Sequence, residues 1–289
     1  MDAVAVSWLH LARAARTVVG MTLHRIRRLR DKGESLVDDV LADEAPLEIQ
    51  VREYDGLFKS VAVVMRTPDD DDRVDEDLAL GFLRTEGVVA SFADVVHIGH
   101  CTTAVSADAE GNVLQVRLRA GVVVDWARLT RHTFSSSSCG VCGKATIDAV
   151  LQTLPSASLS SIAAPSAAAA AALCERLRIG QTLFAVTGGT HGAMLVVDDR
   201  LLAIREDVGR HNAVDKVIGH ALRAGTDFSK TTLVVSGRIA FEIVQKAAVV
   251  GIGVIVAVGA PTSLAVSLAQ RAGMTLVGFV RAGRANVYC

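Results

Sequence analysis

The sequence has few aromatic residues, few prolines and almost no net charge. Phe, Trp and Tyr make up 4% of its 289 residues, and proline occurs 5 times. Lys and Arg total 30 against 31 Asp and Glu, which gives a formal net charge of -1 at pH 7. The chain therefore has no overall electric field that would attract nucleic acid or an anionic membrane. We expect no nucleic-acid partner and no membrane partner.

A long apolar run is also missing. The most apolar late stretch, from Val249 to Val258, is far shorter than the roughly 20 residues that a membrane helix needs. In residues 1–26 an acid, Asp2, precedes the apolar residues, and Arg13 and Arg16 interrupt them, unlike the order of a signal peptide. We expect residues 1–26 to be a disordered extension and the protein to be cytoplasmic.

The residues that are abundant favour an α/β protein. Hydrophobic residues make up 51% of the chain, and they are mostly Ala, Val, Leu and Ile, as in buried parallel strands with covering helices. The pattern predicts a smaller, mostly β, α+β domain over residues 27–132 and a layered C-terminal domain with a largely parallel sheet over 145–289. A mobile Ser-rich linker, 133–144, joins them.

Periodicity places individual elements within these domains. Alternating apolar residues over 47–51 and 61–65 predict a hairpin, and acids before 78–83 indicate a helix N-terminus. Ser166 is placed to cap an Ala-rich helix that Gly180 ends. Further strands are expected at 95–98, 113–118, 183–186, 194–197, 201–205, 232–235, 254–258 and 275–280, with helices at 214–222, 241–249 and 262–272.

Small, hydroxyl and arginine residues follow three of the predicted C-terminal strands. They are the segments 236–238, 259–263 and 281–284. In layered α/β folds, ligands collect outside the carboxyl ends of parallel strands. These segments therefore suggest a site for a phosphate-bearing ligand.

The sequence has five cysteines, and two of them, Cys139 and Cys142, form a CxxC motif. Cys101, Cys174 and Cys289 stand alone, so a four-ligand zinc site is under-supplied. No His is followed two residues later by Glu, which excludes the zinc deaminase signature. The glycine and lysine after Cys142 also lack the remaining residues of a P-loop. We expect no metal held by the protein.

Redox exchange and sulfur carriage remain as uses of the two thiols. A thioredoxin-like motif follows a strand, whereas Cys139 follows the run Ser135 to Ser138. A tether of this kind allows a persulfide to be loaded at one place and delivered at another. The residues alone favour the carrier only slightly over the redox pair.

Two further segments each have two interpretations. The glycine-rich stretch 187–192 suits either a site for an anion or cofactor or a plain tight turn. Asp207, His211 and Asp215 are spaced at i, i+4 and i+8, which would put them on one helix face if all three were helical. That face suits acid-base chemistry or an exposed, salt-bridged surface, and Gly209 is a candidate for the start of the helix.

Several motifs in order resemble the formate dehydrogenase accessory sulfurtransferase family. The resemblance runs from about Arg27 to the C-terminus. It is carried by residues 65–68 and 78–87 in the first domain, by 137–144 around the two cysteines, and by 205–216, 236–238, 241–242, 260–263 and 283–288 in the second domain.

The resemblance implies a sulfurtransferase that accepts sulfur from a cysteine desulfurase as a persulfide. The acceptor is the molybdenum cofactor, Mo-bis(molybdopterin guanine dinucleotide), before its insertion into formate dehydrogenase. Cys139 matches the persulfide cysteine and Cys142 the secondary thiol. The residues that match the cofactor-binding segment are Phe279, Val280, Arg281, Ala282, Gly283 and Arg284.

The family also implies a C-terminal domain with the cytidine deaminase fold and a homodimer. Two alternatives stay open at this point. One is a thiol-disulfide oxidoreductase, and the other is a non-catalytic chaperone that binds the cofactor.

Overall fold

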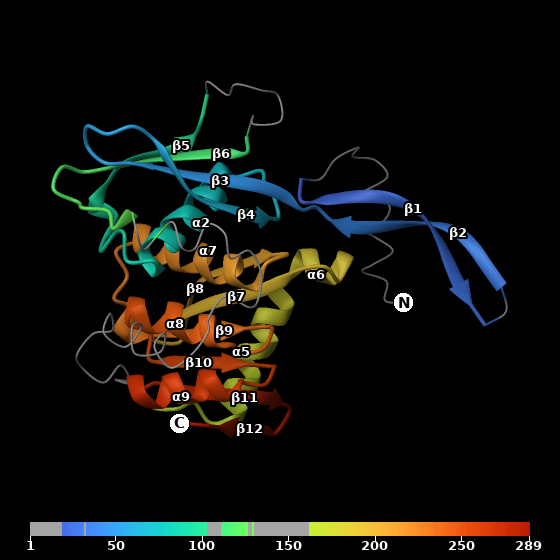
Figure 1. The fold of residues 1–289 in the computed structure, drawn as a ribbon. Coiled ribbons are helices and arrows are strands. Elements are labelled where there is room, and N and C mark those ends of the chain that lie inside the picture. Colours follow the sequence, from blue (N-terminus) through green and yellow to red (C-terminus); the bar gives the residue numbers. More distant parts are fainter. Residues whose placement is uncertain (1–18, 32, 103–110, 127–128, 130–161) are drawn as a thin grey trace.

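The structure is a computed structural model that describes residues 19–31, 33–102, 111–126, 129 and 162–289. Within these residues an arm, a four-stranded sheet and a six-stranded sheet follow one another along the chain (Figure 1). The α/β class is confirmed. The predicted linker 133–144 lies outside the described residues, so that boundary stays a prediction.

The arm is an antiparallel hairpin of β1 (Met21–Arg30) and β2 (Gly33–Ala42) that extends away from the rest of the molecule (Figure 1). The expected disordered extension over 1–26 is therefore wrong for residues 21–26. Arginines break the apolar alternation of β1, and acids of β2 compensate them across the hairpin. Arg25 lies 3.0 Å from Asp38, and Arg28 lies 3.7 Å from Asp39. The sequence of β1 alone does not show this pairing.

The four-stranded sheet has the order β4-β3-β6-β5 among the described residues. Its strands are β3 (Ala45–Arg52), β4 (Lys59–Arg66), β5 (Val95–His100) and β6 (Val113–Leu118). The predicted hairpin is confirmed, because β3 and β4 pair antiparallel. Leu47, Ile49 and Val51 are buried beneath the sheet, as are Leu114 and Val116, so alternate residues of β3 and β6 point to the opposite, outer face.

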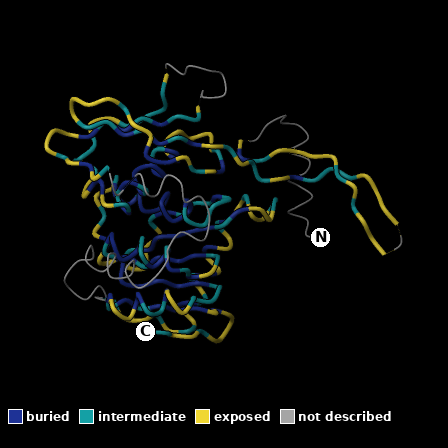
Figure 2. The backbone as a smooth tube through the Cα atoms, in the orientation of Figure 1, coloured by how far each residue is buried: buried dark blue, intermediate teal, exposed yellow. Residues whose placement is uncertain are grey.

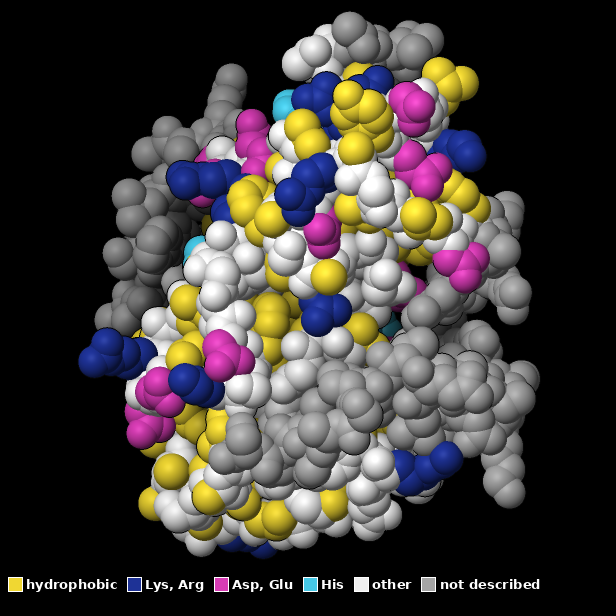
Figure 3. All heavy atoms as spheres, turned by 90° about the vertical axis from the view of Figure 1, so that its left-hand side faces the viewer, with side chains coloured by type: hydrophobic (Ala, Val, Ile, Leu, Met, Phe, Trp, Pro, Cys, Tyr) yellow, Lys and Arg dark blue, Asp and Glu magenta, His cyan; other side chains and the backbone are white. Residues whose placement is uncertain are grey.

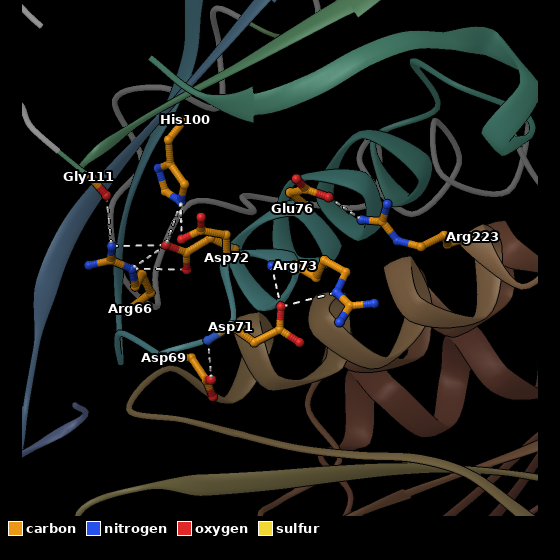
Figure 4. A network of polar contacts seen from close by, with 10 residues as sticks. Arg66, Asp69, Asp71, Asp72, Arg73, Glu76, His100, Gly111 and Arg223 are labelled. Carbon is orange, nitrogen blue, oxygen red and sulfur yellow. Dashed lines mark hydrogen bonds and ion pairs between the residues drawn. The ribbon is translucent and has the colours of Figure 1, made fainter. Parts of the chain in front are cut away.

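Helix α2 (Asp72–Thr85) covers the inner face of this sheet. The expected acidic N-terminus is confirmed, since Asp71 caps the helix and accepts a hydrogen bond from the Arg73 N–H. Figure 4 shows Asp69 bonded to the Asp71 amide just before it. Arg66, at the end of β4, is buried, and its guanidinium donates to both carboxylate oxygens of Asp75 of α2 at 3.0 Å.

The described C-terminal sheet has the order β12-β11-β10-β9-β7-β8. It comprises β7 (His191–Val197), β8 (Arg200–Asp207), β9 (Thr231–Val235), β10 (Val254–Ala257), β11 (Thr275–Arg281) and β12 (Arg284–Val287). Only β9, β10 and β11 run parallel, while β7, β8 and β12 pair antiparallel. The sheet is mixed rather than largely parallel, because short hairpins join β7 to β8 and β11 to β12.

Helices cover both faces of this sheet (Figure 1). On one face lie α7 (Arg210–Arg223), α8 (Phe241–Val250) and α9 (Ser263–Ala272), and on the other lies α5 (Ala167–Gly180). Ser166 caps α5 as predicted, and Gly209 is the N-cap of α7. All four residues of β10 are buried, as expected for a central strand between two helical layers.

A single buried core joins the four-stranded sheet, α2, α7 and one face of the C-terminal sheet. Figure 2 shows this continuous buried interior, in contrast with the exposed arm. Helices α2 and α7 approach each other at two glycines. A Cβ at Gly81 would lie 1.9 Å from the Asp215 carbonyl oxygen, and one at Gly219 would lie 1.8 Å from that of Asp77. Only glycine allows this crossing.

Acidic and basic side chains are interspersed over the face shown in Figure 3. Among the described residues, no helix is long and apolar enough to span a membrane. Nor does any group of three His, Cys, Asp or Glu lie together as candidate metal ligands in that part of the chain.

Candidate functional site

The two cysteines of the CxxC motif, Cys139 and Cys142, lie outside the described residues. Their roles therefore stay predictions. The three other cysteines are described and form no disulfide. Burial raises the pKa of the Cys174 thiol to about 11, and burial also raises that of Cys289. Because the thiolate is the nucleophile, these two cysteines are poorly suited to sulfur chemistry at neutral pH.

A cavity of about 810 Å³ opens where the parallel strands end. We call it the strand-end cavity. It lies between α5 and the segments that follow β9, β10 and β11, beside the start of β7. Its lining residues include Cys174, Leu177 and Arg178 of α5, Gly188, Gly189, Thr190 and His191 before and at the start of β7, Ser236 and Gly237 after β9, Val258 after β10, and Val280, Arg281 and Ala282.

Close backbone contacts shape the floor of the cavity. A Cβ at Gly259 would lie 2.4 Å from the Gly237 carbonyl oxygen, so the loops after β9 and β10 meet this closely only because residue 259 is glycine. The Phe279 N–H donates to the Gly259 carbonyl at 3.0 Å, which ties β11 to the same loop. The predicted convergence of small residues at the strand ends is thus present in the structure.

The predicted cofactor segment contributes half of its residues to this cavity. Val280, Arg281 and Ala282 line it, whereas Phe279, Gly283 and Arg284 are not among its lining residues. Gly283 has φ +77° in the turn between β11 and β12. Arg284 starts β12 and is exposed. Of the two arginines expected near phosphate, Arg281 alone borders the cavity.

The guanidinium of Arg281 is held in place by backbone carbonyls. Its Nη1 donates to the Val258 carbonyl at 2.9 Å and to the Val280 carbonyl at 2.8 Å. Arg178, the other arginine of the lining, is engaged with Glu175 at 2.6 Å and 2.8 Å. Arg281 is therefore the better placed of the two for an anionic ligand.

Phe279 has an unusual backbone. Its φ is +52°, a left-handed conformation that is strained for a bulky residue, and the pairing of β11 with β12 is irregular between Gly278 and Arg281. The side chain is 46% exposed. Strain of this kind often accompanies a binding site, and here it lies one residue from the cavity lining.

The glycine-rich stretch 187–192 follows a helix, α6 (Thr182–Thr187), where a strand over 183–186 was expected. The reason is a distant carboxylate: Glu206 accepts hydrogen bonds from the amides of Leu183 and Phe184 and so caps the helix. The Gly188 and Gly189 amides are occupied by the Phe184 carbonyl and the Thr187 hydroxyl. The stretch is a tight turn that shapes the cavity.

The charged run 205–216 does not form one helix face. Asp207 ends β8, and it lies fully buried 2.7 Å from Lys216, whose ammonium also donates to the Thr67 carbonyl. Asp215, on α7, is buried against Lys246 of α8 at 2.7 Å and accepts from the Thr85 hydroxyl. Both expected roles, an acid-base face and an exposed salt-bridged face, are wrong for these carboxylates.

Two histidines lie in basic surroundings near the cavity. Burial, followed by the nearby Arg210 and Arg238, lowers the pKa of His191, which lines the cavity. Burial is also the main cause that lowers the pKa of His211 to about 4, although Glu242 lies 4.0 Å away. His191 belongs to the stretch 187–192 that the sequence offered as a candidate site, whereas the α5 residues of the lining were missed, because α5 carries no pattern beyond that of a structural helix.

Comparisons with known proteins give consistent matches. The model of the FdhD/NarQ family matches residues 42–289. A sulfur carrier protein FdhD from Streptomyces avermitilis is 44% identical over 274 residues, covering 91% of this chain and 92% of the relative. One from Mycobacterium tuberculosis is 45% identical over 274 residues, covering 92% and 96%. The crystal structure of a proposed formate dehydrogenase accessory protein from Desulfotalea psychrophila shares the fold, with a TM-score of 0.71, 24% identity and coverage of 93% of this chain and 97% of that one.

Proposed function

The chain belongs to the FdhD/NarQ family, and from this premise we propose that it is a sulfur carrier in the maturation of formate dehydrogenase. It takes sulfur from a cysteine desulfurase and transfers it to the molybdenum cofactor, Mo-bis(molybdopterin guanine dinucleotide). The observation that carries this proposal is the strand-end cavity, which is lined by Val280, Arg281 and Ala282.

The loading step uses Cys139. Its thiolate attacks the outer sulfur of the persulfide on the desulfurase. The sulfur–sulfur bond of that persulfide breaks, the desulfurase thiolate leaves, and a persulfide forms on Cys139. No electrons are gained or lost overall. The raised pKa values of Cys174 and Cys289 favour the CxxC cysteines for this role.

The delivery step uses Cys142. Its thiolate attacks the inner sulfur of the Cys139 persulfide and expels hydrosulfide toward the acceptor. A Cys139–Cys142 disulfide remains, and a cellular dithiol reduces it with two electrons for the next cycle. This chemistry gives each of the two thiols of the CxxC motif a role, and it requires no metal held by the protein.

The cavity suits one nucleotide arm of the acceptor. Its volume of about 810 Å³ falls in the usual range for small-molecule sites, roughly 300–1,000 Å³. The Arg281 guanidinium, fixed by two carbonyls, neutralises phosphate charge. The exposed ring of Phe279, two residues before Arg281 in the chain, offers a flat apolar surface for the guanine base. Gly283 leaves open space at the turn.

The proposal also includes that the protein acts in the cytoplasm and forms a homodimer. A hairpin of two strands is marginally stable alone, and the arm exposes Leu29 (70%) and Leu36 (64%). A second copy of the chain would cover such residues, which supports a dimer.

The test compares wild-type protein with Cys139→Ala and Cys142→Ala, using Cys101→Ala as a matched control. Each is incubated with a cysteine desulfurase and sulfur-labelled cysteine, and then with immature formate dehydrogenase and its cofactor. We expect Cys139→Ala to keep only background label and to leave formate dehydrogenase inactive. Cys142→Ala should accept label and deliver it slowly, and Cys101→Ala should match wild type.

Other outcomes point to the alternative functions. If Cys139→Ala carries as much label as wild type and activates formate dehydrogenase, the assignment of the carrier cysteine is wrong. Full activation by the double Cys139→Ala, Cys142→Ala protein would identify a chaperone instead. A reversible Cys139–Cys142 disulfide with catalytic reduction of insulin would identify an oxidoreductase.

A further inference from the structure

The outer face of the four-stranded sheet carries a second recess, of about 310 Å³. It lies on the N-terminal sheet, whereas the strand-end cavity belongs to the C-terminal sheet. Its lining residues are Arg52, Phe58, His97, Gln115 and Arg117. We call it the arginine recess. Figure 3 shows basic and apolar side chains side by side near the top of the face, over this sheet.

The sheet register brings three basic residues together. Arg52 of β3 is the direct cross-strand partner of Arg117 of β6, and Arg117 is in turn paired with His97 of β5. Like charges at directly opposed positions of a sheet destabilise it. The opposed arginines therefore lower the stability of this sheet, and the fold of the sheet gives no reason for placing them there.

No carboxylate compensates these arginines within the part of the chain that the structure describes. The Nε atoms of Arg52 and Arg117 are buried there and have no hydrogen-bond partner. Glu53, which directly follows β3, is already engaged, since it accepts from the Val124 amide at 3.1 Å and from the Trp126 indole at 3.1 Å. Buried donors of this kind call for an acceptor.

The remaining residues hold the guanidinium groups in place. Arg52 lies over the ring of Phe58, with 5.0 Å from its Cζ to the ring centre, which orients the guanidinium plane. Gln115 is fixed by a 3.0 Å hydrogen bond to Gln50. A planar guanidinium with free N–H groups matches a carboxylate with two parallel hydrogen bonds.

The surroundings favour a protein as the source of that carboxylate. The loop between Arg52 and Phe58 exposes Tyr54 (65%) and Leu57 (83%). Arginine beside exposed aromatic and apolar residues is the composition of protein interfaces. We infer that the arginine recess is a docking site for an acidic segment of a partner protein, with one carboxylate seated between Arg52 and Arg117.

The probe is a short fluorescein-labelled peptide of alternating glutamate and leucine, capped at both ends, and its binding to the full-length protein is followed by fluorescence anisotropy. The matched peptide has glutamine in place of glutamate. We expect the double variant Arg52→Gln, Arg117→Gln to bind the acidic peptide roughly tenfold more weakly or worse. The control, Arg27→Gln with Arg30→Gln on the exposed arm, removes the same charge and should bind as wild type.

A second variant tests geometry separately from charge. Arg52→Lys with Arg117→Lys keeps both charges and loses the planar fork, so its affinity should fall between those of wild type and the glutamine variant. Circular dichroism melts check that each variant is folded. Equal affinity of wild type and the glutamine variant would overturn the inference. So would displacement of the peptide by inorganic phosphate at equal concentration, because it would mark a small-anion site.

Discussion

The contact between α2 and α7 and the strand-end cavity differ in how they use charged residues. Beside the helix contact, Asp207 at the end of β8 is buried and paired with Lys216 of α7, and Asp215 of α7 is buried and paired with Lys246 of α8. At the cavity, Arg281 is exposed and its guanidinium donates to two backbone carbonyls. The first arrangement leaves no charge available for a ligand, and the second leaves a guanidinium in position to bind one.

This difference in the use of charge distinguishes the helix contact, which is structural, from the cavity, which is suited to binding. The segment 205–216 is rich in charged residues, yet it joins the two sheets. The ligand cavity is marked by glycines that let loops meet and by the left-handed backbone of Phe279. In this fold, the left-handed backbone of Phe279 indicates the site better than charge density does.

The largest expected effect is at the helix crossing. In Gly219→Ala the new Cβ would fall 1.8 Å from the Asp77 carbonyl oxygen, so α2 and α7 must separate. We expect the free energy of unfolding to fall by roughly 3–5 kcal/mol, measured by urea denaturation. Gly56→Ala is the control, because nothing lies closer than 3.9 Å to its Cβ position. A similar loss of unfolding free energy in both variants would show that α2 and α7 do not cross as closely at Gly219 as the structure has them.

The next effect concerns the buried ion pair. Lys216→Met leaves the carboxylate of Asp207 buried without its cation, although Thr67, Gly209 and Asn212 still donate to it. We expect a loss of about 3 kcal/mol in the free energy of unfolding. Lys230→Met removes a lysine whose pair with Asp227 is exposed, and should change stability by less than about 0.5 kcal/mol. If both variants lose the same free energy of unfolding, the buried pair contributes no more to stability than the exposed one.

A smaller effect depends on pH. The pKa of His211 is about 4 in the folded protein and near 6.5 when unfolded. Below pH 6.5 the unfolded chain therefore binds a proton that the folded chain does not. The stability from neutral His211 is complete above pH 6.5 and is lost as the pH falls toward 4, by roughly 1–3 kcal/mol.

His211→Gln removes this contribution, so its free energy of unfolding should depend less steeply on pH between 6.5 and 4 than that of wild type. His24→Gln, on the exposed arm, should follow wild type. Equal pH slopes for wild type and His211→Gln would show that His211 is not held neutral.

The smallest effect on stability is expected at the cavity. Arg281→Gln should change the free energy of unfolding by less than about 1 kcal/mol, because the side chain is exposed. It should weaken binding of guanosine diphosphate roughly tenfold in calorimetry. Arg284→Gln, outside the cavity lining, is the control. If the two variants lose affinity equally, the cavity is not the nucleotide site.

Local patterns in the sequence predicted much of the fold. Alternating apolar residues predicted the hairpin of β3 and β4, and Ser166 and Gly209 marked the starts of α5 and α7. Helix α6 was missed because its cap, Glu206, lies more than twenty residues away along the chain. Periodicity carries no information about such a partner.

The candidate site was predicted only in part. The resemblance to the family placed Arg281 in a binding segment, and the structure places it at a cavity. The paired roles of Asp207 and Asp215 were missed because their partners Thr67 and Lys246 come from other elements. The contribution of α5 was missed because its residues meet the other lining residues, which come from distant parts of the sequence, only in the folded protein.

The location of the carried sulfur tests the central claim most directly. Wild-type protein is incubated with a cysteine desulfurase and cysteine, alkylated, digested and analysed by peptide mass spectrometry. We predict one additional sulfur atom on the peptide that contains Cys139, and none on those that contain Cys174 or Cys289. Additional sulfur on Cys174 or Cys289, with Cys139 unmodified, would contradict the account.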